Sequence, residues 1–217
     1  YQKGFGGHFH NDNSLAVLRD IPGIIIACPS CGADAAAMLR EAVRLAREEQ
    51  RVVVFIEPIA LYHTRDLEDG DSAWMDRYPS PEKRIGLNDV GVHGDGCDLA
   101  IVTYGNGHYL SRQAAKTLEA GGTRTRVIDL RWLAPLPIAA LLEVVSDCSN
   151  VLIVDECRGT GGQAEGLMAL FSEERLENFA RLVAEDSFIA TGPAYAATMP
   201  SKNSIVEAAR KLMKRVE

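Results

Sequence analysis

The sequence predicts an α/β fold built on parallel sheets, and two observations lead to this prediction. Short apolar runs rich in β-branched residues have the length of strands that are buried on both faces, as in a parallel sheet. Amphipathic helical patterns separate most of these runs, and repeated strand–helix units favour layers of helices packed on a sheet. With 217 residues, 47% of them hydrophobic, the chain can form one large domain or two small ones.

The first part of the chain predicts one strand–helix–strand unit. Residues 23–28 and 52–56 are the apolar runs that we expect to form its two parallel strands. The helix between them is expected to start near Ser30, because Asp34 then falls in the first turn, where negative charge suits the helix dipole. Its apolar stripe consists of Ala35, Met38, Leu39, Ala42, Leu45 and Ala46. A shorter helix is expected over residues 15–21, because a Pro-Gly pair follows them.

Residues 76–97 are predicted to be a linker, so that residues 1–75 and 98–217 form two separate domains. The stretch from Thr64 onward is rich in Asp, Pro and Gly and breaks any hydrophobic period. A long irregular stretch of this composition is typical of a domain boundary.

The second part of the chain predicts a three-layer α/β domain, because strand and helix patterns alternate from residue 98 onward. Strands are expected at 99–104, 125–130, 151–155 and 181–184, and helices at 109–119 and 204–214. Two further helices are expected, one introduced by Pro135 and Pro137 and ending near Val145, and one opened by Gly161-Gly162 and ending near Ser172. The glycine-rich residues 105–107 are interpreted as a turn that precedes the first of these helices.

A glycine-rich loop near the start of the chain is the first candidate for a functional site. Three glycines between Gly4 and Gly7 allow the backbone to pass close to another group, and His8 and His10 follow them. Loops carried on a rigid scaffold often hold the reactive groups of a protein. His8, His10 and Asp12 could also bind a metal ion, but two histidines at this spacing without a second group of ligands favour no metal site.

The sequence from Gly159 to Ala164 matches the G-x-G-x-x-A pattern of dinucleotide-binding proteins. It follows a predicted strand and opens a helix, and Glu185 and Asp186 lie at a suitable distance for a ribose contact. The alternative is a strand-to-helix turn in which glycines only ease the backbone, and we favour this alternative because three residues separate the strand from the first glycine.

Cysteine content and charge limit the classes of function. The five cysteines form no disulfide framework, and Cys28 and Cys31 in a C-x-x-C pattern are predicted to be free thiols, as expected in a reducing cytoplasm. The net charge of −7 and the lack of a basic cluster argue against nucleic acid as a partner. No apolar run has the length of a membrane span.

Several stretches of the chain, in order and spacing, resemble the beta subunits of thiamine-diphosphate-dependent 2-oxo acid dehydrogenase E1 components, members of the transketolase superfamily. In the first part these stretches are residues 6–11, 22–24, 28–30, 55–58 and 61–62. In the second part they are residues 99–105, 127–131, 155–156 and 160–162. Gly94-Asp95-Gly96 is similar to the start of a thiamine-diphosphate metal site, but the Asn-Asn pair that such a site needs is absent. We therefore interpret it as a surface turn.

The resemblance implies a fold and a division of labour. Residues 1–75 would be the C-terminal half of a pyrimidine-binding domain, and residues 98–217 a transketolase-type C-terminal domain. The complete enzyme would oxidatively decarboxylate a 2-oxo acid and transfer the acyl group to a lipoyl carrier. It would use thiamine diphosphate and Mg, and neither is expected to bind to this piece alone. Expected partners are a diphosphate-binding domain or alpha subunit, a lipoyl acyltransferase (E2), and further copies in a homo- or hetero-oligomer.

The resemblance also assigns one catalytic residue. His10 matches the active-site histidine of the family, whereas His8 matches a position that varies. The chain departs from the family after this point, because the family usually continues His-Ser-Gln and this chain has His10-Asn11-Asp12. Two alternatives stay open: a non-catalytic nucleotide-binding or regulatory module, and a transketolase-like enzyme. The chain is expected to be a piece of a longer protein, since it enters the glycine loop within three residues of Tyr1.

Overall fold

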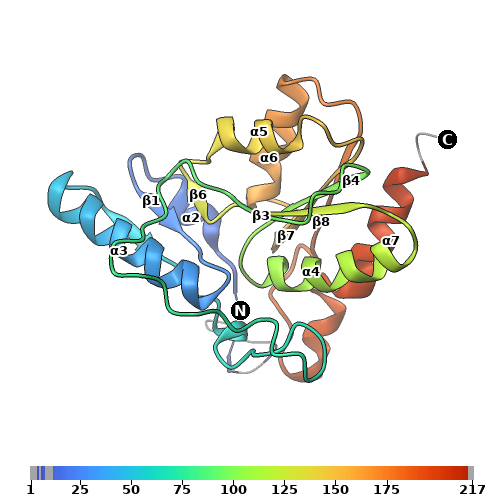
Figure 1. The fold of residues 1–217 in the computed structure, drawn as a ribbon, viewed down its shortest axis with the longest axis horizontal. Helices are drawn as coiled ribbons and strands as arrows, with labels where there is room; N and C mark the ends of the chain where they lie inside the picture. Colours follow the sequence, from blue (N-terminus) through green and yellow to red (C-terminus); the bar gives the residue numbers. More distant parts are fainter. Residues whose placement is uncertain (1–3, 5, 8–11, 215–217) are drawn as a thin grey trace.

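The computed structural model describes residues 4, 6–7 and 12–214, which form two sheets with helices around them (Figure 1). The strands are β1 (Ile25–Ala27), β2 (Val53–Phe55), β3 (Gly91–His93), β4 (Leu99–Thr103), β5 (Thr125–Asp129), β6 (Trp132–Ala134), β7 (Val151–Arg158) and β8 (Phe179–Ala184). The α-helices are α2 (Leu15–Arg19), α3 (Gly32–Glu48), α4 (Gly105–Ala120), α5 (Ile138–Val145), α6 (Gln163–Glu173) and α7 (Lys202–Met213). Two short 3₁₀ helices are η1 (Ile59–Leu61) and η2 (Gly192–Ala197).

The second part of the chain forms a three-layer structure, as predicted. Its sheet has the strand order β3-β5-β4-β7-β8, and all neighbours are parallel except β3, which is antiparallel to β5. Successive residues of β4 point to opposite faces, so that Val102 packs with α5 and α6 while Ile101 packs with α4 and α7. Figure 1 shows α5 and α6 on one side of this sheet and α4 and α7 on the other.

The first part of the chain builds a smaller sheet with the order β2-β1-β6. Strands β1 and β2 are parallel, as predicted for the strand–helix–strand unit. Strand β6 comes from the second part of the chain and runs antiparallel to β1, with Ala27 paired to Trp132. The buried side chains of Met38 and Leu45 on α3 and of Trp132 form one hydrophobic cluster. The two parts of the chain therefore share a sheet and a core.

Four differences from the sequence-based predictions have physical reasons. Residues 91–93, predicted as linker, form β3 because they pair with β5. Helix α4 begins at Gly105 rather than Tyr109, and its glycines bring it close to β4: a Cβ on Gly107 would lie 2.4 Å from Thr103 Oγ1. Strand β2 is only half-buried because it lies at the edge of its sheet.

The fourth difference concerns the predicted apolar stripe of α3. Leu39 is 50% exposed, and Val43 is also exposed, whereas Ala37 and Glu41 are buried. The buried face of α3 is therefore rotated relative to the stripe, toward the side that packs on β1 and β6. Among the helices of the described residues, none is long and apolar enough to cross a bilayer.

Candidate functional site

The residues that follow the predicted histidine loop lie on the end of β7 and on the turn after it. His8 and His10 themselves are outside the described residues, but Asp12 and Asn13 are described. The guanidinium of Arg158 donates to the carboxylate of Asp12 in an ion pair. The side-chain amide of Asn13 donates to the carbonyl of Glu156 over 3.0 Å, and the Cys157 thiol donates to the carbonyl of Asn13 over 3.3 Å.

A second arginine extends this contact to helix α2. Arg19 Nη1 donates to the carbonyl oxygens of Gly161, over 3.1 Å, and of Gly162. A Cβ on Gly161 would lie 3.0 Å from the Cβ of Ala16, so the glycine allows α2 to approach the turn closely. Side chains of both segments therefore hold residues 12–19 against residues 156–162.

Gly4, which precedes the two histidines in the sequence, is also bonded to the second part of the chain. The Gly192 amide donates to the carbonyl of Gly4 over 2.7 Å, and a Cβ on Gly4 would fall 2.1 Å from Gly192 O. Gly4 has φ +78°, a conformation that favours glycine. Both ends of the segment 4–12, which contains His8 and His10, are therefore held by the second part of the chain.

The charge state of Asp12 is set by this contact. Partial burial would raise the pKa of Asp12, but the hydrogen bonds from Arg158 and Ser14 outweigh it and lower the pKa below its ordinary value. Asp12 is therefore a carboxylate at neutral pH.

The carboxylate of Asp155 joins the end of β7 to the start of α6, next to the residues that contact Asp12 and Asn13. Its carboxylate accepts hydrogen bonds from the backbone amides of Cys157 (2.8 Å) and Ala164 (2.7 Å) and from the Tyr104 hydroxyl (2.5 Å). Gly162 leaves room for this carboxylate, since a Cβ there would lie 2.8 Å from Asp155 Oδ2. The carboxylate satisfies backbone amides at the start of α6 that would otherwise have no acceptor.

The same turn contains the predicted dinucleotide pattern, and its geometry favours the alternative of a structural turn. A pyrophosphate would need free backbone amides at the start of α6. The amide of Ala164 is bonded to Asp155 and the amide of Gly161 to Glu165 Oε2 at 2.7 Å, so two negative groups lie where the phosphates would bind. Glu185 and Asp186 are the two acidic residues at the spacing expected for a ribose contact. The carboxylate of Asp186 accepts a hydrogen bond from the Thr160 hydroxyl, and the backbone amide of Glu185 donates to the carbonyl of Thr198.

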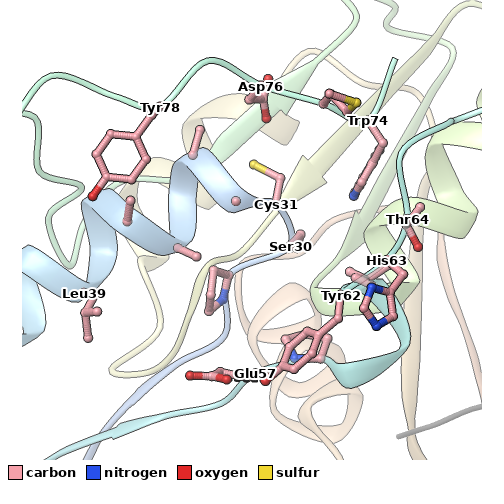
Figure 2. Close-up of a pocket in the computed structure, with 18 of the residues that line it drawn as sticks. Ser30, Cys31, Leu39, Glu57, Tyr62, His63, Thr64, Trp74, Asp76 and Tyr78 are labelled. Carbon is pink, nitrogen blue, oxygen red and sulfur yellow. Dashed lines mark hydrogen bonds between the residues drawn. The ribbon is translucent and has the colours of Figure 1, made fainter. Parts of the chain in front are cut away.

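A pocket of about 760 Å³ lies at the carboxyl ends of β1 and β2. Figure 2 shows Tyr62, His63 and Trp74 along one side of it and the start of α3, with Cys31 and Leu39, along the other. Two acidic residues, Glu57 and Asp76, also line it. The carboxyl ends of parallel strands are a common place for ligands in α/β proteins, and sequence reasoning did not identify this pocket.

Two groups that line the pocket, the Cys31 thiol and the Tyr62 hydroxyl, hold their protons at neutral pH. Burial and the nearby carboxylate of Asp34 raise the pKa of the Cys31 thiol to about 12, so it is not a thiolate at neutral pH. The Tyr62 hydroxyl donates to Glu57, and this hydrogen bond raises the pKa of Tyr62. Cys28 is buried, and both thiols of the C-x-x-C pattern are free, as predicted. Within the described ranges, no three His, Cys, Asp or Glu side chains gather as a metal site would require.

His93, His108 and Asp129 form a polar cluster that packs against Trp74. The His108 ring lies 5.4 Å from the Trp74 ring and 4.7 Å from the His93 ring, measured between centroids, and His108 Nδ1 lies 3.6 Å from Asp129 Oδ2. Burial lowers the pKa of His108 well below its usual value and raises the pKa of Asp129 to about 7. No local pattern could have predicted this cluster, because its members come from β3, α4, β5 and the segment before β3.

Comparison with known proteins is consistent with this architecture. The family model for the transketolase C-terminal domain matches residues 88–205. The chain is 28% identical to the pyruvate dehydrogenase E1 component subunit beta of Bacillus subtilis and 27% identical to that of Staphylococcus aureus; each match covers 96% of this chain. It spans 63% of the length of each of these relatives.

A solved structure shows the same fold. A split-gene transketolase, described as an inactive beta4 tetramer, matches with a TM-score of 0.72 and 22% sequence identity, over 92% of this chain and 60% of that chain. At this identity the likeness concerns the fold, which is α/β with parallel sheets in both proteins. Because the family model matches more than half of the 217 residues, the chain belongs to the transketolase C-terminal domain family.

Proposed function

We propose that this chain is part of a thiamine-diphosphate-dependent 2-oxo acid dehydrogenase E1, in the role of its beta subunit. The complete enzyme would oxidatively decarboxylate a 2-oxo acid and transfer the acyl group to a lipoyl carrier. The observation that carries the proposal is the similarity to pyruvate dehydrogenase E1 beta subunits over 96% of the chain. The anchoring of both ends of the segment 4–12 supports it, since a catalytic loop needs a fixed scaffold.

His10 is proposed as the catalytic residue of this chain. When the dithiolane of a lipoyl group opens, its S–S bond breaks, one sulfur takes the acyl group and the other takes a proton. An imidazole can supply that proton because its usual pKa lies near neutral pH. The family resemblance assigns this position to His10, and Asp12 two residues later is fixed on Arg158.

Thiamine diphosphate and Mg would be bound by other parts of the complete enzyme. Among the described residues, no three His, Cys, Asp or Glu side chains gather as a metal site would require. Gly94-Asp95-Gly96 is followed by no Asn-Asn pair. Gly96 packs on the backbone directly before β5, where a Cβ would lie 2.2 Å from the carbonyl carbon of Arg124. A diphosphate-binding domain or alpha subunit is therefore proposed as a partner, together with a lipoyl acyltransferase (E2) and further copies in a homo- or hetero-oligomer.

Five free thiols support a reducing compartment such as the cytoplasm. A nucleotide-binding module is the alternative from another class, and the carboxylates at the start of α6 argue against it. Titration with NAD or ATP, followed by thermal unfolding, distinguishes the two: we expect no change in the melting temperature, and saturable stabilisation would favour the module.

The proposal is tested by single-turnover acyl transfer in the complete enzyme. We expect His10→Ala to slow transfer to the lipoyl carrier by about 10²–10⁴-fold, the usual contribution of a general acid, with cofactor affinity little changed. His8→Ala serves as the matched control and should cost much less. Equal losses, or a larger loss in the His8 variant, would contradict the assignment of His10.

A further inference from the structure

We propose that a cavity between α4 and β3 binds a small organic oxyanion, an apolar molecule that carries a carboxylate or a phosphate group, with Arg112 as the main anchor. The cavity has a volume of about 400 Å³ and shares no lining residue with the pocket at the carboxyl ends of β1 and β2. Its polar lining includes Arg112 and Lys116 of α4 and His93 of β3. The E1 function proposed above does not require such a site, so the inference goes beyond that function.

The guanidinium of Arg112 is half-buried, and among the described residues no Asp or Glu forms an ion pair with it. Its Nη1 donates to Nδ1 of His93 over 2.8 Å, since a guanidinium has no acceptor of its own. The same group has five N–H donors, so most of them remain available to a ligand in the cavity.

The nearby carboxylates do not compensate for the burial of this charge. Asp76 and Glu119 attract Arg112, but burial outweighs them and lowers the pKa of the guanidinium below its ordinary value. Glu119 is also engaged elsewhere, because its carboxylate accepts a hydrogen bond of 2.6 Å from the Thr125 hydroxyl. An oxyanion would supply the missing partner, since carboxylate and phosphate groups form paired, charge-assisted hydrogen bonds with a guanidinium.

His93 and Lys116 complete the polar side of the cavity. Burial, together with the positive charges of Arg112 and Arg131, lowers the pKa of His93 to about 4, so its neutral ring accepts from Arg112 and orients the guanidinium. Lys116 follows Arg112 by one helical turn, and its Nζ lies 3.3 Å from a carboxylate oxygen of Asp71. An exposed ion pair of this kind contributes little, so the ammonium can turn toward a ligand at small cost.

The apolar part of the lining indicates a ligand larger than a bare ion. Leu67, Val92 and Val127 line the same cavity, and a volume of about 400 Å³ falls in the range of about 300–1,000 Å³ typical of small-molecule sites. The side chains of Val92 and Lys116 are 44% and 46% exposed, so the cavity is open to solvent. An apolar body beside these walls would add hydrophobic burial to the contact with Arg112.

The test is calorimetric titration of the full-length protein at neutral pH and low salt with phenyl phosphate, benzoate and inorganic phosphate. Phenyl phosphate and benzoate distinguish a phosphate ester from a carboxylate, and we expect saturable binding of at least one of them. Inorganic phosphate should bind about tenfold more weakly than phenyl phosphate, because it has no ring to bury against the apolar walls.

Three variants locate the binding. Arg112→Lys keeps the charge but lacks the planar fork, so it should weaken binding about 10- to 100-fold. Arg124→Lys is the matched control and should leave the affinity unchanged, because Arg124 is exposed and paired with Asp98. Val92→Asp places a carboxylate in the cavity while Arg112 stays, and like-charge repulsion should weaken binding by a similar factor. Because Val92 is exposed, this variant decides the question if Arg112→Lys does not fold.

The contrary outcomes are specific. No saturable binding of phenyl phosphate or benzoate to the wild type would overturn the site. Binding that persists unchanged in Arg112→Lys and Val92→Asp would place the anion elsewhere and would overturn it as well. Equal affinities for phenyl phosphate and inorganic phosphate would overturn the role of the apolar walls. None of these results depends on acyl transfer, so failure of this site leaves the proposed function standing, and failure of the His10 test leaves this site standing.

Discussion

The hydroxyl of Tyr104 donates a hydrogen bond of 2.5 Å to Oδ1 of Asp155, and both residues are buried. The bond joins the end of β4 to the end of β7, where the chain turns into α6. Burial and the adjacent carboxylate raise the pKa of Tyr104 well above its usual value, so the hydroxyl remains a donor throughout the physiological pH range. The end of β7 and the turn after it therefore depend on a hydrogen bond inside the core.

Tyr104→Phe should lower the free energy of unfolding by about 1–3 kcal/mol, because a buried carboxylate loses a donor. Urea denaturation followed by circular dichroism measures this change. Tyr78→Phe is the control: Tyr78 is 79% exposed, and we expect a change within about 0.5 kcal/mol. Similar changes in the two variants would show that Asp155 does not need the hydroxyl.

Asp129→Asn should alter how stability depends on pH. The pKa of Asp129 is raised to about 7 in the fold, from an ordinary value of 3.8, because the carboxyl group is buried. The folded state therefore holds a proton that the unfolded state has lost between these pH values, and the wild type loses stability as pH rises through this window.

The asparagine variant lacks this titration, so its stability relative to the wild type should improve by about 2 kcal/mol between pH 5 and pH 8. Urea denaturation of both proteins at the two pH values gives the comparison, and terms from groups that Asp129 does not contact cancel in the difference. A constant difference between the two proteins would mean that Asp129 ionises normally.

Two glycine substitutions should have opposite effects on stability. A Cβ on Gly96 would lie 2.2 Å from the backbone of Arg124, so Gly96→Ala should lower the free energy of unfolding by about 1–3 kcal/mol or more. Gly32 is the exposed first residue of α3, and nothing lies within 4 Å of its added Cβ. Gly32→Ala should stabilise the protein by about 0.4–1 kcal/mol. Thermal melting of both variants checks the order, and a stable Gly96→Ala protein would show that β5 can shift.

The five cysteines should differ in their reaction with an alkylating reagent. Cys28 and Cys157 are buried, and burial raises the pKa of both thiols, so they should react only after unfolding. Cys31 is half-buried and should react slowly, because its pKa is about 12. Intact mass measured with and without denaturant follows the labelling. A mass difference of two protons on reduction, assigned to Cys28 and Cys31, would contradict the free thiols.

The elements that the sequence predicted correctly are those with a strong local pattern. Strands β4 and β7 begin with unbroken apolar runs, and α6 begins directly after the glycine pair that was expected to open it. Strands β3 and β6 were not predicted because each has only three residues and is defined by its partner, β5 or β1. Pairing between distant segments leaves no periodicity in the sequence. The division of the chain at residues 75 and 97 stays a prediction.

The candidate site was only partly predictable for a related reason. The histidine loop and the glycine turn were each identified from local residue types, but their contact through Asp12 and Arg158 joins residues 146 positions apart. The pocket beside α3 likewise combines residues from α3, β2, η1 and the segment before β3. Single-residue chemistry is visible in a sequence, whereas the pairing of such residues depends on the fold.

The antiparallel pairing of β1 with β6 has a consequence for the integrity of the polypeptide. The amide of Cys28 donates to the carbonyl of Arg131 over 2.8 Å, beside the strand pair, and Trp132 fills the core under α3. After a proteolytic cut between residues 78 and 88, the two pieces should therefore stay associated through the pairing of β1 with β6. The piece before the cut supplies β1 and β2 and the piece after it supplies β6, so the smaller sheet is complete only while the two pieces stay together.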